Sequence, residues 1–182
     1  AGSFHLGLDF FENITVAHEE GGQLYVETHG TGVADRVPLG PGTEPHLAFS
    51  LLGSYIAYAA TTSGAEGGRR IFLRSGIGAR WSSPQQVSSG EGDDRRPYLQ
   101  IMEDGVPVTV WENRPAESPS RIWFRRGTRP PVDVGRGDHP ALVLDRWGRA
   151  HVFFLRDDDI FYSKESSTQP GLFAHAANVT QT

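Results

Sequence analysis

The sequence predicts an all-β fold, a four-bladed β-propeller with four antiparallel strands per blade. Three observations lead to this prediction. Four segments with alternating hydrophobic residues begin 41, 52 and 43 residues apart. Further strand patterns follow each segment in the same order, and no segment shows a sustained 3.6-residue apolar period of helical length. Units of about 45 residues with four short strands match the repeat of a propeller blade.

The first strand of each unit carries large apolar residues at its third and fifth positions, which is typical of a strand with one packed face. These strands are residues 4–9, 45–50, 97–102 and 140–145. A second strand follows after a turn, at residues 14–17, 56–59, 108–111 and 152–155. Gly53, Gly105 and Gly148 lie in three of these turns, where glycine readily adopts a positive φ.

The two remaining strands complete each unit. The third strands are residues 24–26, 71–73, 122–124 and 160–162, and the fourth are residues 37–39, 85–87, 132–134 and 177–179. Pro38 is tolerated in a fourth strand because an outer edge strand need not donate on both sides. A sixteen-strand sandwich is the rival architecture, but it would not require four units with matching internal offsets.

The repeats divide the chain into blades within a single domain, residues 1–182. The approximate blade ranges are 3–42, 43–92, 93–137 and 138–182. The chain begins with a first strand and ends with a fourth, so closure of a ring would depend on packing of blade one against blade four. The small inner residues Gly7 and Ala48 favour closure at four blades. The alternative is that the chain forms part of a larger ring.

Composition excludes several classes of function. The chain has 182 residues, a net charge of -5 and no cysteine. Mild acidity argues against nucleic acid as a partner, since phosphate binding needs clustered Lys and Arg. The lack of cysteine excludes disulfides, thiolate chemistry and Cys-ligated zinc. No apolar run reaches the roughly 18 residues of a membrane span. The first residues lack an initiator methionine, which fits a mature secreted chain, a fragment or a tag remnant, and we expect a secreted or extracytoplasmic location.

Residues 75–81 read Ser-Gly-Ile-Gly-Ala-Arg-Trp, and residues 82–87 continue Ser-Ser-Pro-Gln-Gln-Val. This stretch resembles the Asp-box repeat of sialidase-type propellers, Ser-x-Asp-x-Gly-x-x-Trp followed by Ser-x-Pro-x-x-Val. The Trp and the tail match, whereas the loop is one residue short and lacks the Asp. Residues 166–173 form a more degenerate copy, with Thr168 at the Asp position and Pro170 at the Gly position. The resemblance implies a propeller fold, and in that family these loops are mainly structural.

Polar side chains cluster just before the first strands, at the end of a propeller where loops from all blades converge. Their residue types suit a polar or anionic small molecule. The cluster contains His5, Glu44, His46, Asp94, Arg95, Arg96, Tyr98, Asp138 and His139. The alternative is that these groups form hydrogen bonds and ion pairs that hold neighbouring blades together.

The end of the second strands supplies another polar set, richest in the third unit at Trp111, Glu112, Asn113 and Arg114. An exposed Trp beside Glu, Asn and Arg is typical of sugar-binding clefts. However, Trp111 aligns with Ala17, Ala59 and Leu155 in the other units, which indicates a core position between blades.

The spacing of the possible Asp and His ligands gives little support for a metal site. The acidic run Asp157–Asp159 is an oxygen-rich candidate for calcium, but it lacks the ligand spacing of a calcium loop and is better interpreted as a solvated turn. A zinc site from His5, His46 and His139 is conceivable around the axis. We assign no metal, no cofactor and no catalytic residue.

The leading hypothesis is a non-enzymatic, lectin-like module that binds a glycan or another small polar ligand on one propeller face. Its predicted binding residues are His5, His46, Arg95, Arg96, Tyr98, Trp111, Glu112, Arg114 and His139. A sialidase-like glycoside hydrolase or lyase is the second hypothesis, since these Arg, Tyr and Glu residues include the types required. Two-carboxylate hydrolysis would need a pair about 5–10 Å apart. The third hypothesis is a protein-interaction scaffold, because propellers host all three functions.

Overall fold

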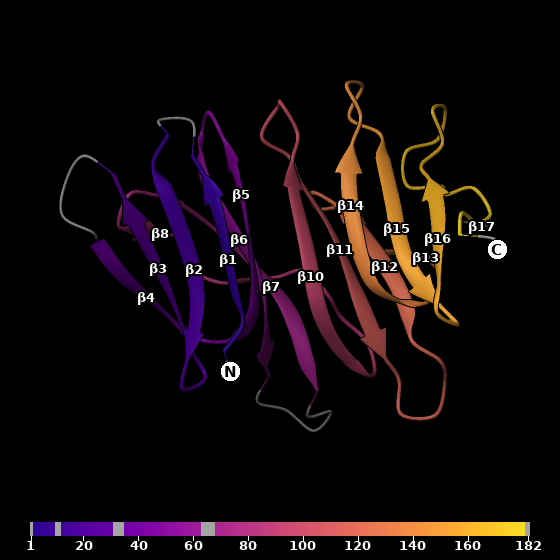
Figure 1. Ribbon diagram of the computed structural model, residues 1–182, viewed down its shortest axis with the longest axis horizontal. Coiled ribbons are helices and arrows are strands. Elements are labelled where there is room, and N and C mark those ends of the chain that lie inside the picture. Colours follow the sequence, from indigo (N-terminus) through magenta and orange to yellow (C-terminus); the bar gives the residue numbers. More distant parts are fainter. Residues whose placement is uncertain (1, 10–11, 31–34, 63–67, 181–182) are drawn as a thin grey trace.

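The computed structural model describes residues 2–9, 12–30, 35–62 and 68–180. In these ranges the chain forms seventeen strands and no helix, and the strands assemble into four antiparallel sheets. Figure 1 shows the sheets side by side along the longest axis, with one sheet for each sequence unit. The prediction of an all-β, four-bladed propeller arrangement is confirmed.

Each blade is an antiparallel meander in which consecutive strands pair, with one exception at the last strand of blade 2. Blade 1 contains β1 (Phe4–Leu8), β2 (Ile14–Glu20), β3 (Gln23–His29) and β4 (Asp35–Pro41). Blade 2 contains β5 (Thr43–Ser50), β6 (Gly53–Thr61), β7 (Arg69–Ile77), β8 (Arg80–Trp81) and β9 (Gln85–Gln86). Blade 3 contains β10 (Asp93–Ile101), β11 (Pro107–Arg114), β12 (Arg121–Arg126) and β13 (Val132–Arg136). Blade 4 contains β14 (Asp138–Leu144), β15 (Ala150–Arg156), β16 (Asp159–Lys164) and β17 (Ala177–Asn178).

Blade 2 contains one strand more than the sequence predicted. Its Asp-box-like segment forms a hairpin, in which β8 and β9 both pair with β7. The Trp81 ring lies so close to Gly76 that a Cβ there would come within 2.5 Å of it. The box therefore has a structural role. The three predicted turn glycines also have positive φ, at 140° for Gly53, 81° for Gly105 and 74° for Gly148.

The hydrophobic core lies between blades and forms three clusters, one at each junction of consecutive blades. In blades 2, 3 and 4 the third-position leucine of the first strand is central to the junction, because it packs on the face of the preceding blade. Leu47, Leu99 and Leu142 are only 3%, 0% and 0% exposed, respectively. Their equivalent in blade 1, Leu6, is 58% exposed.

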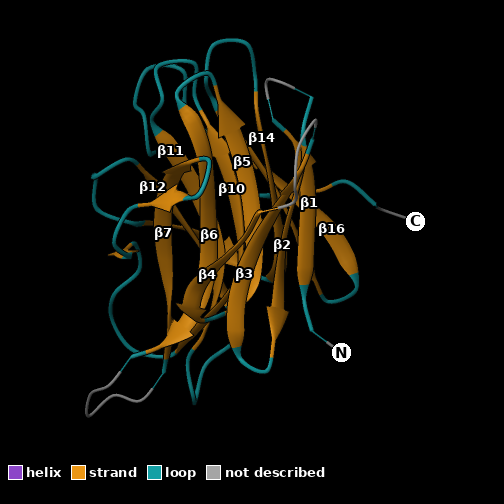
Figure 2. Cartoon of the chain, turned by 90° about the vertical axis from the view of Figure 1, so that its left-hand side faces the viewer, coloured by secondary structure: helices purple, strands orange, loops and turns teal. Residues whose placement is uncertain are grey.

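This difference shows that blade 1 lacks a preceding neighbour. Blades 1 and 4 lie at opposite ends of the molecule in Figure 1, and Figure 2 views it from the blade 1 end. The packing of blade one on blade four that ring closure would need is therefore not observed among the described residues. The small residues Gly7 and Ala48 do not bring the ends together, because a Cβ at Gly7 would meet the Phe49 ring of the next blade rather than an empty axis. In the described residues, no helix is long and apolar enough to cross a membrane.

We predict that Leu99→Ala lowers the free energy of unfolding by about 3 kcal/mol, because it leaves a cavity in a fully buried junction. The control is Leu51→Ala, in a turn where the side chain is 74% exposed, and it should cause little change. Urea denaturation followed by Trp fluorescence measures both. Similar losses in the two variants would contradict the assigned core.

Candidate functional site

The first strands of blades 2, 3 and 4 each begin with a bulge that contains a non-glycine residue at positive φ. These residues are Glu44, Arg96 and His139, with φ of 54°, 50° and 49°. The pairing register of each strand shifts at this point. Such backbone conformations are costly for residues with a Cβ, so the surrounding contacts must hold them.

Those contacts come from the preceding blade. The backbone N–H of Glu44 donates to Ser3 Oγ at 2.8 Å, and that of Arg96 donates to Glu44 Oε2 at 2.6 Å. The N–H of His139 donates to Glu112 Oε2 at 3.4 Å. A chain of hydrogen bonds thus crosses all three blade junctions at the end where the first strands begin.

Glu112 is the charged centre of this region, since its side chain is fully buried. Its carboxylate accepts hydrogen bonds from Arg96 Nη1 at 2.8 Å, from Arg114 Nε and from Ser120 Oγ at 3.4 Å. Burial alone would raise the pKa of Glu112, but the hydrogen bonds and charges of Arg114 and Arg96 outweigh it and lower the pKa. Glu112 is therefore an ionised carboxylate that Arg114 and Arg96 hold in place, and it does not act as a proton donor.

Two histidines and a tyrosine form a row along the inner strands. The His5 and His46 ring centroids are 3.9 Å apart, and those of His46 and Tyr98 are 4.0 Å apart. His5 Nδ1 accepts the Leu47 N–H at 3.1 Å, and His46 Nδ1 accepts the Leu99 N–H at 3.3 Å. Burial, together with the charge of His5, lowers the pKa of His46 to about 3. Both rings thus act as neutral acceptors that join blades.

The other predicted site residues lie in separate surroundings. Arg95 is paired with Asp93, which also binds Arg69. Trp111 is only 2% exposed, and its Nε1–H donates to the buried Asp94 at 3.2 Å. It therefore occupies the core between blades 2 and 3 and presents no ring face to a ligand.

The structure brings Arg96 and the His139 backbone, from the set just before the first strands, next to Glu112 and Arg114, from the set at the end of the second strands. It also contains the inter-blade hydrogen bonds and ion pairs of the alternative interpretation. Ligand binding by these residues stays a prediction. The guanidinium groups of Arg96 and Arg114 are partly exposed, at 35% and 39% of their side-chain surfaces, and could reach a ligand from this end.

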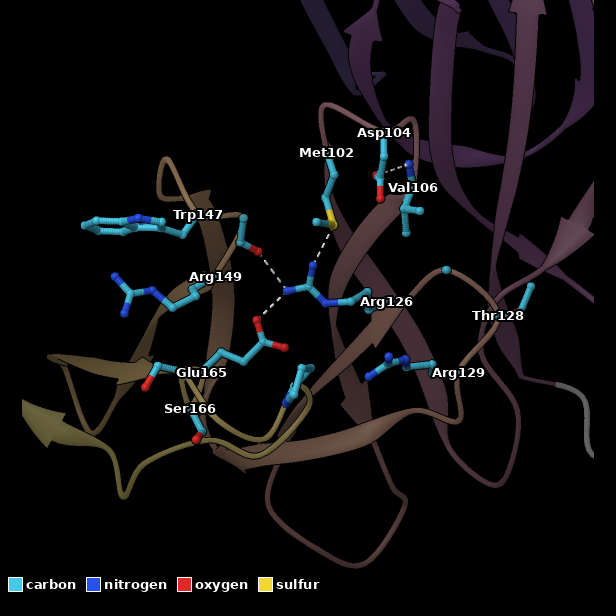
Figure 3. A pocket seen from close by; sticks show the side chains of 14 residues that line it. Met102, Asp104, Val106, Arg126, Thr128, Arg129, Trp147, Arg149, Glu165 and Ser166 are labelled. Carbon is cyan, nitrogen blue, oxygen red and sulfur yellow. Dashed lines mark hydrogen bonds and ion pairs between the residues drawn. The ribbon is translucent and has the colours of Figure 1, made fainter.

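A second surface lies at the opposite end of the strands, between blades 3 and 4. A hollow of about 480 Å³ is formed there by the β10–β11, β12–β13 and β14–β15 turns and by the segment after β16. We call it the Trp147 hollow. Figure 3 shows Arg126 at its centre, with Trp147 and Arg149 on one side and Arg129 on the other.

Trp147 is held at the tip of a tight turn. Asp145 Oδ1 accepts the backbone N–H groups of Trp147 and Arg149 at 2.9 and 3.0 Å, and Gly148 supplies the positive φ. The Trp147 side chain is 63% exposed. The guanidinium carbons of Arg146 and Arg149 lie 4.0 and 4.5 Å from its ring centroid, which places the indole in cation–π contact.

A buried ion pair supports this hollow. Arg126 pairs with Glu165 and donates to the Gly148 carbonyl at 2.9 Å. Glu165 also accepts the N–H groups of Ala150 at 2.9 Å and Gly171 at 2.8 Å. The carboxylate therefore anchors the turns that form the hollow. Arg129 has no hydrogen bond from its side chain to any residue in the described ranges.

The sequence prediction missed Trp147. A signal was available, because the Asp-Arg-Trp-Gly segment lies between the first and second strands of blade 4, and side chains at the tip of such a turn face solvent. Within the described residues, no group of three or more His, Asp or Glu side chains could hold a metal ion. Asp157 and Asp158 form a turn with φ of 52° and 68°.

Comparisons with known proteins identify the fold. No family model and no curated protein matches the sequence. The endo-arabinase from Bacteroides thetaiotaomicron VPI-5482 aligns with 93% of this chain and 77% of its own, at TM-score 0.52 and 11% identity. The GH43 BlXynB protein from Bacillus licheniformis aligns with 95% of this chain and 41% of its own, at TM-score 0.54 and 12% identity.

A third similar structure is MPT-4, a mannose phosphorylase from Leishmania mexicana, which was solved with a phosphate ion. It aligns with 97% of this chain and 67% of its own, at TM-score 0.52 and 9% identity. Identities this low show the fold alone. The likeness supports a propeller without pointing specifically to sialidase repeats, and this chain spans between 41% and 77% of the three structures.

We predict that Glu112→Gln lowers the free energy of unfolding by roughly 2 kcal/mol, because two arginines lose a buried counter-charge. Glu20→Gln is the matched control, since Glu20 pairs with Arg36 on the exposed surface, and it should change stability little. Chemical denaturation at pH 7 compares the two. Equal stability of the Glu112 variant and the unaltered protein would contradict the role of Glu112 in holding the blades.

We also predict that acidification destabilises the protein through His46. The pKa of His46 is about 3 in the folded state against 6.5 for an unperturbed histidine, so the unfolded chain binds more protons in this window. Lowering the pH from 7 to 5 should therefore cost about 2 kcal/mol of unfolding free energy from this residue. The loss should be smaller by that amount in His46→Gln. If the unfolding free energies of the two proteins changed equally with pH, the lowered pKa of His46 would not be the cause of the acid destabilisation.

Proposed function

We propose that the protein is a non-enzymatic binding module that recognises a glycan or another small polar ligand in the Trp147 hollow. The exposed Trp147 beside arginine groups is the observation that carries this proposal. A sugar ring that displaces the Arg146 or Arg149 guanidinium from the indole would stack its CH groups on Trp147, while guanidinium and hydroxyl groups bind its hydroxyls or a carboxylate.

The composition of the hollow favours a polar ligand. Arg126, Arg129 and Arg149 line it together with two carboxylates, those of Asp104 and Glu165. Its local charge is therefore slightly positive, although the whole chain has a net charge of -5. Ser166 and Ser167 add hydroxyl groups on the same wall. A neutral or carboxylated oligosaccharide fits this combination of groups.

The proteins with similar structures support a sugar as the ligand class. Their names include an endo-arabinase and a mannose phosphorylase. Binding is favoured over hydrolysis because the buried carboxylates Glu112 and Glu165 are both engaged in ion pairs. An extracytoplasmic location would give access to such polymers and remains part of the proposal.

We predict that arabino-, xylo-, manno- or galacturonate oligosaccharides raise the melting temperature, and that Trp147→Ala weakens binding of the active sugar about tenfold, or roughly 1.4 kcal/mol. Arg129→Ala should also weaken it, because Arg129 offers a free guanidinium group. Arg36→Ala is the control, as Arg36 stacks on Tyr25 in blade 1. Isothermal titration calorimetry measures the dissociation constants.

Two variants separate the alternatives in the same assay. If Arg96→Ala or Arg114→Ala abolishes binding while Trp147→Ala does not, the ligand occupies the surface near the first strands, as the sequence predicted. Release of shorter sugars, abolished by Glu112→Gln, would indicate a glycoside hydrolase instead. Absence of binding across the whole panel would overturn the proposed ligand class and leave the protein-interaction scaffold.

A further inference from the structure

The two outer faces of the blade array carry apolar residues whose counterparts in the other blades are buried. The first case is Leu6, which is exposed although Leu47, Leu99 and Leu142 are buried at the same position. Its neighbours on β1 and β2 continue this surface. We define the blade 1 face by Phe4, Leu6, Leu8 and Ile14, which are 68%, 58%, 63% and 48% exposed.

At the opposite end of the array, blade 4 exposes apolar residues whose counterparts in the other blades are covered by a following blade. Phe153 lies opposite Ala141 in the register of blade 4, just as Ala17, Ala57 and Val110 lie opposite the equivalent residues of their blades. Those three counterparts are fully buried, whereas Phe153 is 36% exposed. We define the blade 4 face by Val143, Phe153 and Ile160.

Ile160 shows independently that this surface of blade 4 is uncovered. It lies two register positions further along, opposite Leu155, at the place that Leu24, Ile71 and Ile122 occupy in the other three blades. All three of those residues are fully buried, but Ile160 is 39% exposed. In blades 1 to 3 this surface is covered by the leucine-bearing first strand of the next blade.

The blade 1 face and the blade 4 face are therefore the two halves of one contact, which the chain forms three times internally. Within one chain the halves lie at opposite ends (Figure 1). A second copy of the chain supplies a blade 4 face for the first copy's blade 1 face, and a blade 1 face for its blade 4 face. When two copies are related by a two-fold axis, the blade 4 face of each can cover the blade 1 face of the other, and no apolar face stays open.

We propose that the protein forms a closed homodimer in which the blade 1 face of each copy packs against the blade 4 face of the other. The repeated junction specifies the chemistry of this interface, with Leu6 as the fourth member of the buried leucine series. Because each copy contributes two different faces, one substitution on either face disrupts both symmetric contacts.

The test is light scattering after size-exclusion chromatography, on the full chain over a concentration series. We expect twice the chain mass of 19.9 kDa. Leu6→Asp and Val143→Asp, one on each face, should each give monomers. Ile77→Asp is the control, because Ile77 is 73% exposed at the end of β7 in blade 2, outside both faces, and it should remain dimeric. Circular dichroism and thermal melting at low concentration check that every variant folds.

Three results would overturn the proposal. A monomer at all concentrations would mean that something other than a second copy covers these faces, such as a further blade of a larger ring. A dimer that survives Val143→Asp but not Leu6→Asp would indicate pairing between two blade 1 faces. Species larger than a dimer would indicate an open head-to-tail chain instead of a closed ring.

Discussion

Burial of one leucine from the first strand of blades 2, 3 and 4 against the face of the preceding blade is the interaction on which the rest of the structure depends. It orders the blades, since a single four-stranded sheet cannot bury both of its faces alone. The polar groups follow from this packing. Once the leucines bring the first strands together, the bulges at Glu44, Arg96 and His139 direct their N–H groups to the neighbouring blade. The buried histidine row then satisfies the N–H groups of Leu47 and Leu99.

Much of this architecture could be predicted from the sequence because the repeat imposes the same alternation four times. The strands, the turn glycines and the core position of Trp111 all follow from aligning the units. The bulges could not be predicted, since Glu, Arg and His seldom adopt positive φ and nothing local in the sequence requires it. Closure could not be predicted either, because the curvature of the array is the sum of three blade junctions and no single motif encodes it.

For the candidate sites, too, one part of the arrangement could be predicted from the sequence and another part could not. The sequence predicted one polar set before the first strands and another at the end of the second strands, and the structure brings Arg96 of the first set next to Glu112 and Arg114 of the second. Glu112 accepts hydrogen bonds from Arg96, Arg114 and Ser120 of its own blade and from the His139 N–H of blade 4, so residue type alone did not separate a ligand site from a structural network. Trp147 was overlooked because the aligned turns share only their glycine, and Leu52 and Asp104 stand where blade 4 has Trp147. Its exposure depends on the local hydrogen bonds from the Trp147 and Arg149 N–H groups to Asp145, which shape the turn.

The central claim is that the four blades form an open array whose two end faces are unpaired within one chain. A crystal structure of the full chain tests this most directly. The account predicts that blades 1 and 4 of one chain stay apart and that Leu6 is covered by a sheet from another copy. A ring closed within one chain, with Leu6 buried against Phe153 of its own blade 4, would contradict it.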